Sequence, residues 1–184
     1  MALEHALLVS LSERPASGLD LARRFDKSIG FFWQASHQQI YKTLGRTERD
    51  GWVASTVVEQ QGRPDKKVYV VSDAGRLAVQ DRLATPTDPS PLRSELGLKM
   101  RGASYAMDRE SVLAEVRNHL ADHQTRLDVF RQLEKRDYPS PESLTGQSLD
   151  QYLVLRGGIR MEEAWVGWLD EYLTAWSRSP KEDS

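Results

Sequence analysis

The amino-acid sequence predicts a mainly α-helical protein with one small β-hairpin, in which an N-terminal winged helix-turn-helix precedes an α-helical C-terminal dimerisation domain. Three observations predict this fold. Residues 36–75 contain a capped helix followed by two short strands, and two short helical patterns precede that segment. A proline-rich break at residues 85–91 then separates this part from two long helical patterns, each with an apolar face.

The first two helices are predicted from apolar residues at helical spacing. The first pattern ends at Pro15 and consists of Leu3, Ala6, Leu7 and Leu11. Ser17 is an expected N-cap for the second helix, because its hydroxyl can accept a hydrogen bond from a backbone amide of the first turn. The residues expected to face inward from that second helix are Leu19, Leu21, Ala22 and Phe25.

The third helix has clear signals at both ends. Ser36 and Gln39 have the spacing of a capping box, in which the two side chains satisfy free amides at the start of a helix. Gly51 follows Arg49 and Asp50, and it suits the left-handed conformation that often ends a helix. Between these ends, Ile40, Leu44 and Thr47 recur at helical spacing.

Two strands and a further helix are predicted after Gly51. Residues 52–58 and 67–71 are rich in β-branched residues, and the polar segment QQGRPDK at residues 60–66 joins them. Residues 72–75 (SDAG) begin the next helix. Three helices followed by a hairpin are the element order of a winged helix-turn-helix, whose third helix reads DNA. Binding of a double-stranded DNA operator is therefore the first functional hypothesis.

The candidate DNA-binding residues follow from this order. Residues early in a reading helix come closest to base edges, which points to His37, Gln38, Tyr41 and Lys42. Phosphate contacts are expected at the helix start and at the wing, because backbone amides and basic side chains bind phosphate oxygens. These further candidates are Ser36, Arg63, Lys66, Lys67 and Ser17, which opens the second helix.

Over roughly its first half, the sequence resembles the PadR-type transcriptional regulators. The motifs that carry the resemblance are SG at 17–18, FWQASHQQIY at 32–41, ERDG at 48–51, GRP at 62–64 and SDAG at 72–75. Thr47 stands where the family usually has leucine, and Asp65 where its wing is more often basic. The second half resembles the longer PadR subgroup, which has a helical C-terminal domain. The resemblance implies a homodimeric regulator, most often a repressor, that responds to a small aromatic (for example phenolic) or hydrophobic effector.

Length and composition agree with a regulator that works inside the cell. The chain has 184 residues, no cysteine and a formal net charge of −2. Residues 1–85 carry 12 Lys and Arg against 10 Asp and Glu, whereas residues 86–184 carry 13 against 17. The absence of cysteine excludes disulfides and suits a cytoplasmic protein. We expect neither a secretory leader nor a membrane span, since no apolar stretch approaches the ~18 residues that a span needs.

The expected domains are residues 1–85 for DNA binding, 86–107 for a linker and short helix, and 108–178 for dimerisation and effector binding. Asp108 is expected to cap a helix that continues to about residue 135, and the last helix is expected at about 148–177. Gly157 and Gly158 should weaken that last helix, which is expected either to kink there or to let another helix approach closely. Its aromatic side requires burial against the preceding helix and a second copy of the chain; the candidate effector-binding residues there are Trp165, Trp168 and Tyr172.

The sequence argues against catalysis. His119 and His123 lie four residues apart with Glu115 one turn earlier, but the segment has no HExxH pattern, and a packed or interface histidine is the preferred interpretation. The chain has no GxSxG, no P-loop and no GxGxxG motif. We therefore expect no catalytic residue, no metal site and no cofactor.

Two other functional hypotheses remain open. In the first, the winged helix is a protein-interaction module without specific DNA binding, which Asp65 and the negative net charge favour. In the second, the chain is an aromatic-lined small-molecule binder whose DNA affinity is incidental.

Overall fold

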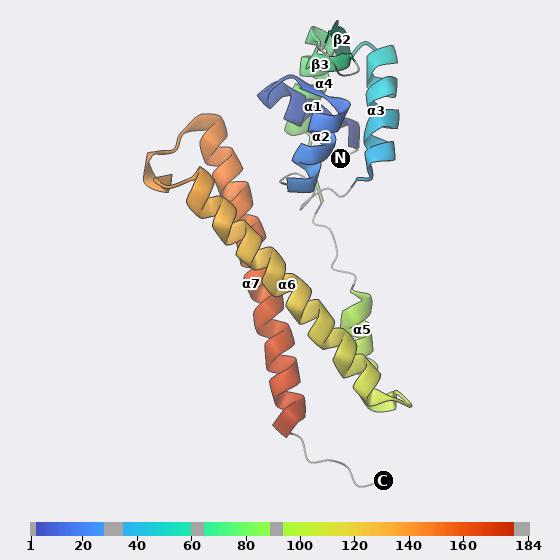
Figure 1. Ribbon diagram of the computed structural model, residues 1–184, viewed down its shortest axis with the longest axis vertical. Helices are drawn as coiled ribbons and strands as arrows, with labels where there is room; N and C mark the ends of the chain where they lie inside the picture. Colours follow the sequence, from blue (N-terminus) through green and yellow to red (C-terminus); the bar gives the residue numbers. More distant parts are fainter. Residues whose placement is uncertain (1–2, 28–34, 60–64, 89–93, 179–184) are drawn as a thin grey trace. The chain divides into compact units, whose positions relative to one another are not determined.

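The computed structural model describes residues 3–27, 35–59, 65–88 and 94–178 (Figure 1). The chain forms two compact units, Met1–Pro89 and Ser90–Ser184. None of the helices in the described ranges is both long and apolar enough to cross a membrane.

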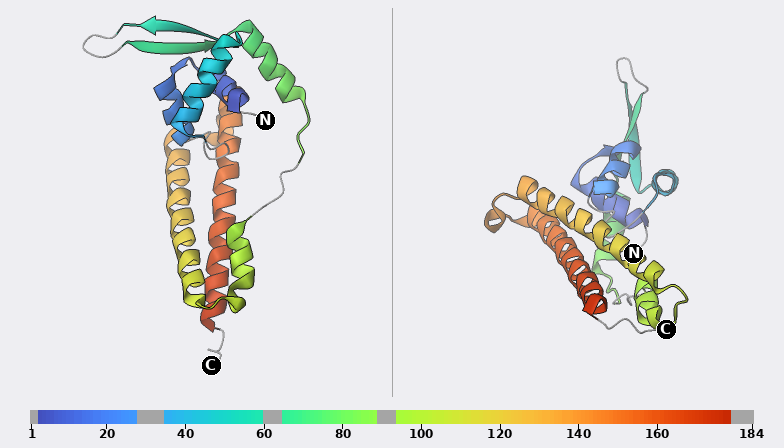
Figure 2. Two further views of the ribbon diagram at one scale, coloured as in Figure 1. Left: turned by 90° about the vertical axis from the view of Figure 1, so that its right-hand side faces the viewer. Right: turned by 60° about the horizontal axis from the view of Figure 1, so that its bottom comes forward.

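In its described ranges, the first unit combines four helices with a small sheet. Its elements are α1 (Leu3–Glu13), β1 (Ala16–Ser17), α2 (Gly18–Lys27), α3 (His37–Arg49), β2 (Val53–Val58), β3 (Lys66–Val71) and α4 (Asp73–Ala84). β2 and β3 extend as an antiparallel pair beyond the helices, which is the wing of a winged helix-turn-helix (Figure 2). The predicted order of three helices, hairpin and helix is confirmed.

The sheet has one strand more than the sequence predicted. Its order is β1-β3-β2 with antiparallel pairing, and Val53 lies opposite Val71 while Val58 lies opposite Lys66. The additional strand, β1, pairs Ala16 with Tyr69. A strand of two residues has no alternating pattern, so only its tertiary pairing reveals it.

The core of the first unit lies between α1, α2, α3 and the sheet. The predicted inward residues are buried, with one exception: Leu19 is 46% exposed. Leu21, Ala22 and Phe25 share one face of α2, whereas Leu19 precedes Leu21 by two positions and so points to the opposite side of the helix. The largest fully buried side chains of this core are Leu7, Leu8, Leu21, Phe25, Ile40, Leu44, Thr47 and Ser10.

The predicted helix ends of α3 are confirmed. The Ser36 hydroxyl accepts a hydrogen bond from the Gln39 amide at 3.2 Å, and the Gln39 side chain accepts one from the Ser36 amide at 2.8 Å. Gly51 has a φ of 74°, which a residue with a side chain rarely adopts. Gly75 permits a close approach, since a Cβ there would lie 2.1 Å from the Trp52 carbonyl oxygen.

The second unit is helical. Its elements are α5 (Glu95–Gly102), a 3₁₀ turn at Ala103–Tyr105, α6 (Arg109–Asp137), a second 3₁₀ turn at Pro141–Ser143, and α7 (Gly146–Arg178). α6 and α7 lie side by side, and α5 packs beside them near one end (Figure 2). Asp108 caps α6 as predicted, because its carboxylate accepts hydrogen bonds from the amides of Glu110 and Ser111.

The second unit refines two sequence expectations. The short helix expected within residues 86–107 is present as α5, and it contributes Leu96 and Met100 to a core shared with Val116 and Leu169. α7 also continues through Gly157 and Gly158 without a break. Gly158 is buried, so packing of the long helix outweighs the low helix propensity of the two glycines.

Candidate nucleic-acid interface

Helix α3 presents one polar face outward. Its opposite face is anchored in the core by Ile40, Thr43, Leu44 and Thr47. The outward face follows the i, i+3, i+4, i+7 pattern and consists of Gln38, Tyr41, Lys42, Gly45 and Arg49. The amide of Gln38 and the amine of Lys42 are exposed. Both groups can donate to base edges in a major groove.

The N-terminus of α3 adds backbone donors at one end of this face. His37 is the first helical residue and is exposed, as is the N-cap Ser36. Because the Ser36 hydroxyl is occupied by the Gln39 amide, its contribution is to fix the helix start. The Gln38 amide, in the first turn, has no i−4 carbonyl partner within the helix and suits a phosphate oxygen.

Tyr41 also connects α3 to the start of α2. A Cβ built on Gly18 would lie 2.3 Å from Cε1 of Tyr41, so the ring lies directly over that glycine. The side chain remains 49% exposed. One side of the Tyr41 ring thus packs on Gly18, while its other side is available to a ligand. Glycine is needed at position 18 because a side chain there would clash with the Tyr41 ring, and not because of its backbone conformation.

Gly45 is the feature of this face that the sequence analysis missed. A Cβ on Gly45 would meet no heavy atom within 4 Å, and its φ is not in the left-handed region. The Arg49 guanidinium donates a hydrogen bond to the Gly45 carbonyl at 3.2 Å. The middle of the outward face therefore has no side chain, and the backbone there lies beside the Arg49 guanidinium.

The two wing lysines are held by carboxylates of the helices. Lys66 lies 2.7 Å from Asp20 of α2, and Lys67 lies 2.8 Å from Glu48 of α3. Glu48 also accepts a 2.5 Å hydrogen bond from the Ser55 hydroxyl, and these two donors hold its pKa below the ordinary value. The Glu48 carboxylate in turn raises the pKa of Lys67. The lysines thus tie the turn-proximal end of β3 to α2 and α3, rather than standing free.

Two phosphate candidates remain, Ser17 and Arg63. The contacts of Ser17 differ from the sequence expectation. Ser17 is 6% exposed, and its hydroxyl donates to the Asp20 carboxylate at 2.8 Å while accepting from the Asp20 amide at 3.2 Å. It is the N-cap of α2 and has no hydroxyl free for a phosphate, so we leave it out of the interface. Arg63 lies outside the described residues.

The Asp20–Lys66 pair makes the wing attachment dependent on pH. Hydrogen bonds from Lys66 and Ser17 lower the pKa of Asp20 from 3.8 to about 2. A carboxyl group whose pKa is lower in the folded state stabilises the fold above its unfolded pKa, and this stabilisation is lost as the pH falls toward the folded pKa. The relevant window therefore runs from about pH 4 down to about pH 2.

We expect Asp20→Asn to lower the free energy of unfolding by about 1 kcal/mol at pH 7, a value reduced for solvent screening of this partly exposed pair. The difference from the parent chain should shrink at pH 3. Urea denaturation at both pH values measures it. Asp81→Asn, an exposed position on α4, is the matched control and should change stability little at either pH. An equal Asp20→Asn effect at pH 3 and pH 7 would contradict the assignment.

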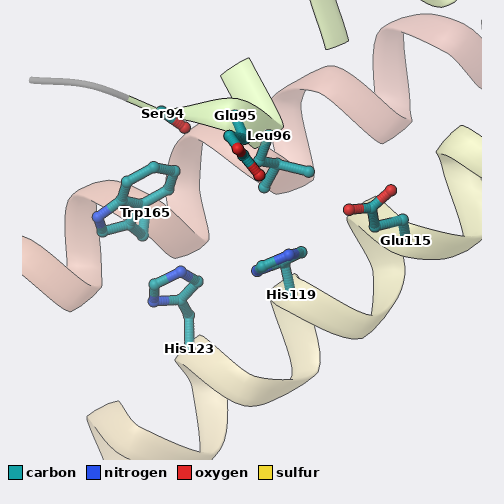
Figure 3. Close-up of a pocket in the computed structure, with 7 residues that line it drawn as sticks. All are labelled: Ser94, Glu95, Leu96, Glu115, His119, His123 and Trp165. Carbon is teal, nitrogen blue, oxygen red and sulfur yellow. The ribbon is translucent and has the colours of Figure 1, made fainter. Parts of the chain in front are cut away.

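In the second unit, one of the three predicted ligand residues, Trp165, lines the cavity formed by described residues. The cavity has a volume of about 300 Å³ and lies between α5, α6 and α7 (Figure 3). Its lining residues are Ser94, Glu95, Leu96, Glu115, His119, His123 and Trp165. Trp168 packs on Trp165 with ring centroids 5.2 Å apart but is 40% exposed, and the Tyr172 hydroxyl donates to the Met100 carbonyl at 2.9 Å. These two residues attach α5 to α7.

His123 is a packed histidine. Its Nδ1 lies 2.5 Å from the carboxylate of Glu162, which is buried, and Arg126 reaches the other oxygen of that carboxylate at 3.1 Å. The described residues contain no group of three or more histidine or carboxylate side chains arranged to hold a metal ion. Glu115, the third member of the sequence pattern, instead forms an ion pair with Lys99 at 2.8 Å.

The fold and the outward face of α3 define a class of protein: winged-helix DNA-binding proteins with a helical second unit. Comparison with known families identifies the family to which this chain belongs. Residues 7–81 match the transcriptional regulator PadR-like family, and residues 92–177 match the family described as virulence activator alpha C-term. A probable transcriptional regulator, Rv1176c, from Mycobacterium tuberculosis is 48% identical over 95% of this chain and 97% of its own. The chain belongs to the PadR-like family of transcriptional regulators.

Solved structures agree with this assignment. The Vibrio cholerae virulence activator AphA is 30% identical, with a TM-score of 0.79 over 96% of this chain and 98% of its own. Bacillus subtilis PadR, solved in complex with operator DNA, is 26% identical, with a TM-score of 0.80 over 94% of this chain and 98% of its own. The same PadR has been solved with p-coumaric acid.

Proposed function

We propose that this regulator is a cytoplasmic homodimeric repressor that binds a double-stranded operator through the outward face of α3. The observation that carries the proposal is the exposed pair Gln38 and Lys42 on a helix whose opposite face is buried in the core. A capped, tightly packed helix holds these two donors in a fixed position, which base recognition requires. Operator binding by Bacillus subtilis PadR and its name, a negative transcriptional regulator, support the choice of repression.

The remaining contacts should position the protein on the phosphate backbone. The helix start at Ser36 and His37, with the first-turn amide of Gln38, and the cations at Lys66, Lys67 and Arg63 serve this purpose. Lys66 and Lys67 share their charge with Asp20 and Glu48, so their contribution to phosphate binding is smaller than that of free lysines. Their main effect is to hold the wing at a fixed angle to α3.

We place the dimer contact on one flank of α7. Val154, Met161 and Trp168 recur every seven residues and are 40–56% exposed. We call these three residues the α7 stripe. They border the face of α7 that packs on α6, whereas the other flank carries charged residues such as Arg160, Glu163 and Asp170. A seven-residue apolar repeat is what a partner helix covers in a coiled coil, and a second copy of α7 provides the matching surface.

The protein acts by binding and not by catalysis. An effector bound in the second unit would shift the equilibrium between two arrangements of the reading heads, only one of which fits the operator. The p-coumaric acid bound by Bacillus subtilis PadR supports a small aromatic effector for this family member too. The paired wing lysines favour one rival hypothesis, a winged-helix protein-interaction module, which the following experiment also tests.

Binding of the full-length protein to DNA from upstream of its own gene is the decisive experiment. A band-shift titration combined with footprinting should reveal two protected half-sites about one helical turn, ~34–36 Å, apart. The affinity for this DNA should exceed that for an unrelated fragment by ~10³-fold or more, compared at one fixed salt concentration. Equal affinity for the two fragments would refute the repressor and favour the interaction module.

A further inference from the structure

The cavity of the second unit has the composition of a small-molecule site. It is bounded by three helices: α5 supplies Ser94, Glu95 and Leu96, α6 supplies Glu115, His119 and His123, and α7 supplies Trp165 (Figure 3). Its volume of about 300 Å³ is at the lower end of the range for small-molecule pockets, ~300–1,000 Å³. A ligand of one ring and a short side chain would fill a cavity of this size.

One wall of this cavity is aromatic and fixed in place. The rings of His123 and Trp165 are parallel within 5°, with centroids 5.0 Å apart, and the ring of His119 follows at 6.5 Å from His123. Glu162, itself held by Arg126, fixes the His123 ring from behind. A rigid series of flat rings binds a planar ligand with little loss of side-chain entropy.

The cavity also contains two acidic residues. Glu115 lies on α6 one turn before His119, on the same side as the histidines, whereas Glu95 lies at the start of α5 and its carboxylate faces the open space between His119 and Trp165 in Figure 3. The Lys99 amine donates hydrogen bonds to both oxygens of the Glu115 carboxylate, at 2.8 Å and 3.0 Å. Among the described residues, Glu95 forms no hydrogen bond or ion pair, although its charge contributes to the raised pKa of Lys99, four residues further along α5. The Glu95 carboxylate is therefore open to a ligand, and no lysine or arginine of the described ranges lines the cavity.

We propose that this cavity binds a small aromatic cation, in which a planar ring carries a protonated amine on a short chain. The ring would lie against Trp165 and His123, and the ammonium group would pair with Glu95. An indole face and a carboxylate both attract a cation. An aromatic carboxylate such as p-coumarate would instead bring its charge toward Glu95 and Glu115, so this cavity discriminates against the ligand class of the Bacillus subtilis relative.

The position of α5 gives the cavity a route to regulation, a step that rests on the proposed function. Ser94 is the N-cap of α5, its hydroxyl accepts a hydrogen bond from the Gly97 amide, and Glu95 is the first residue of the helix. The chain reaches this point from α4 through only residues 85–93. A ligand that binds Glu95 and Trp165 together would restrict the start of α5 and thereby the end of the segment that leads from the DNA-binding unit.

Calorimetric titration of the full-length protein with two probes of opposite charge tests the site. Phenethylamine should bind at least ~10-fold more tightly than 3-phenylpropionate, which shares its ring and chain but carries a carboxylate. Glu95→Gln should weaken phenethylamine binding ~10-fold, while Glu171→Gln, an exposed position on α7 outside the cavity, should leave it unchanged. Equal binding of the two probes, no binding of phenethylamine, or equal effects of the two substitutions would overturn the proposal.

A second measurement separates the site from its regulatory consequence. Operator affinity should change at least severalfold when phenethylamine saturates the wild-type protein, and this change should require a higher amine concentration in Glu95→Gln. If the amine binds but operator affinity stays constant, the regulatory step is wrong while the binding site stands. If the protein binds no operator at all, the proposed function fails, and the calorimetric result remains interpretable.

A different observation supports a second inference, on DNA recognition by Gly45. Glycine inside a helix costs up to about 1 kcal/mol relative to alanine. Neither steric crowding nor backbone conformation accounts for this glycine, because a Cβ would meet nothing within 4 Å. Gly45 also lies in the middle of the outward face, between Lys42 and Arg49. We infer that Gly45 lets the α3 backbone approach the DNA closely. Bound DNA, and not a contact within the protein, is then what excludes a side chain at this position.

This inference predicts effects of opposite sign on stability and on binding. Gly45→Ala should raise the free energy of unfolding by up to about 1 kcal/mol and lower operator affinity ~10-fold, and Gly45→Leu should lower that affinity further. Gly167→Ala on α7, where an added Cβ would be equally uncrowded and which lies away from the α7 stripe, is the matched control and should leave operator affinity unchanged. Unchanged or increased operator affinity in both Gly45 variants would overturn the inference.

Discussion

Lys42→Ala should lower operator affinity about 100-fold. Lys42 is exposed on the outward face of α3, one turn from the helix start, where a side chain reaches the bases or the adjacent phosphates. Loss of one such contact costs ~1–3 kcal/mol, and a homodimer loses it twice. Because the side chain is outside the core, the free energy of unfolding should change little.

The measurement is a band-shift titration on the operator fragment at two salt concentrations. Lys135→Ala removes the same charge from an exposed position on α6 and is the matched control, so its operator affinity should remain close to that of the wild type. A loss of phosphate contact should also reduce the dependence of affinity on salt, whereas a purely base-specific contact should leave the salt slope unchanged. Equal effects of Lys42→Ala and Lys135→Ala would exclude α3 as the reading helix.

Met161→Glu should raise the dissociation constant of the dimer at least 100-fold. Met161 is the central residue of the α7 stripe and is 56% exposed in the single chain, so the substitution leaves the fold of one copy unstrained. In a dimer built on this stripe, the new carboxylate would be buried against apolar side chains, which costs several kcal/mol unless it is paired. The two-fold symmetry of such a dimer places two of these charges in one interface.

Sedimentation equilibrium or light scattering over a concentration series measures the dissociation constant, and circular dichroism verifies that the helices are retained. Met107→Glu introduces the same charge at a fully exposed methionine of the second unit, away from the stripe, and should remain dimeric. The Met161→Glu monomer should also lose most of its operator affinity, because a single reading head covers one half-site. A Met161→Glu protein that remains dimeric would place the dimer contact on another surface.

The local features of the first unit could be predicted from its sequence because they depend on neighbouring residues. The capping box of Ser36 and Gln39, the left-handed Gly51 and the two strands of the hairpin all arise within a few residues of chain. The N-cap Asp108 is a comparable case in the second unit. Each is a backbone preference or a short-range hydrogen bond, which the order of residues is sufficient to determine.

Side-chain partners between elements could not be predicted in this way. Lys66 and Lys67 look like free cations beside the wing turn, yet Asp20 and Glu48 come from helices 46 and 19 positions earlier in the chain. The sequence also suggested a ligand site at three aromatic residues, of which Trp165 alone lines the cavity. Glu95 was not among the candidates, since its place in that cavity depends on how α5 packs against α6 and α7.

The sequence by itself determined the order of elements, the position of the third helix of the winged helix-turn-helix and the family resemblance, because helix caps, turn glycines and apolar periodicity are local properties. Tertiary structure alone decided which polar groups are available for a ligand. Lys42 and Gln38 remain exposed, Ser17 is buried in its capping interaction, and the wing lysines are paired with distant carboxylates. Availability depends on what folds against a side chain, and that depends on contacts between segments far apart in the sequence.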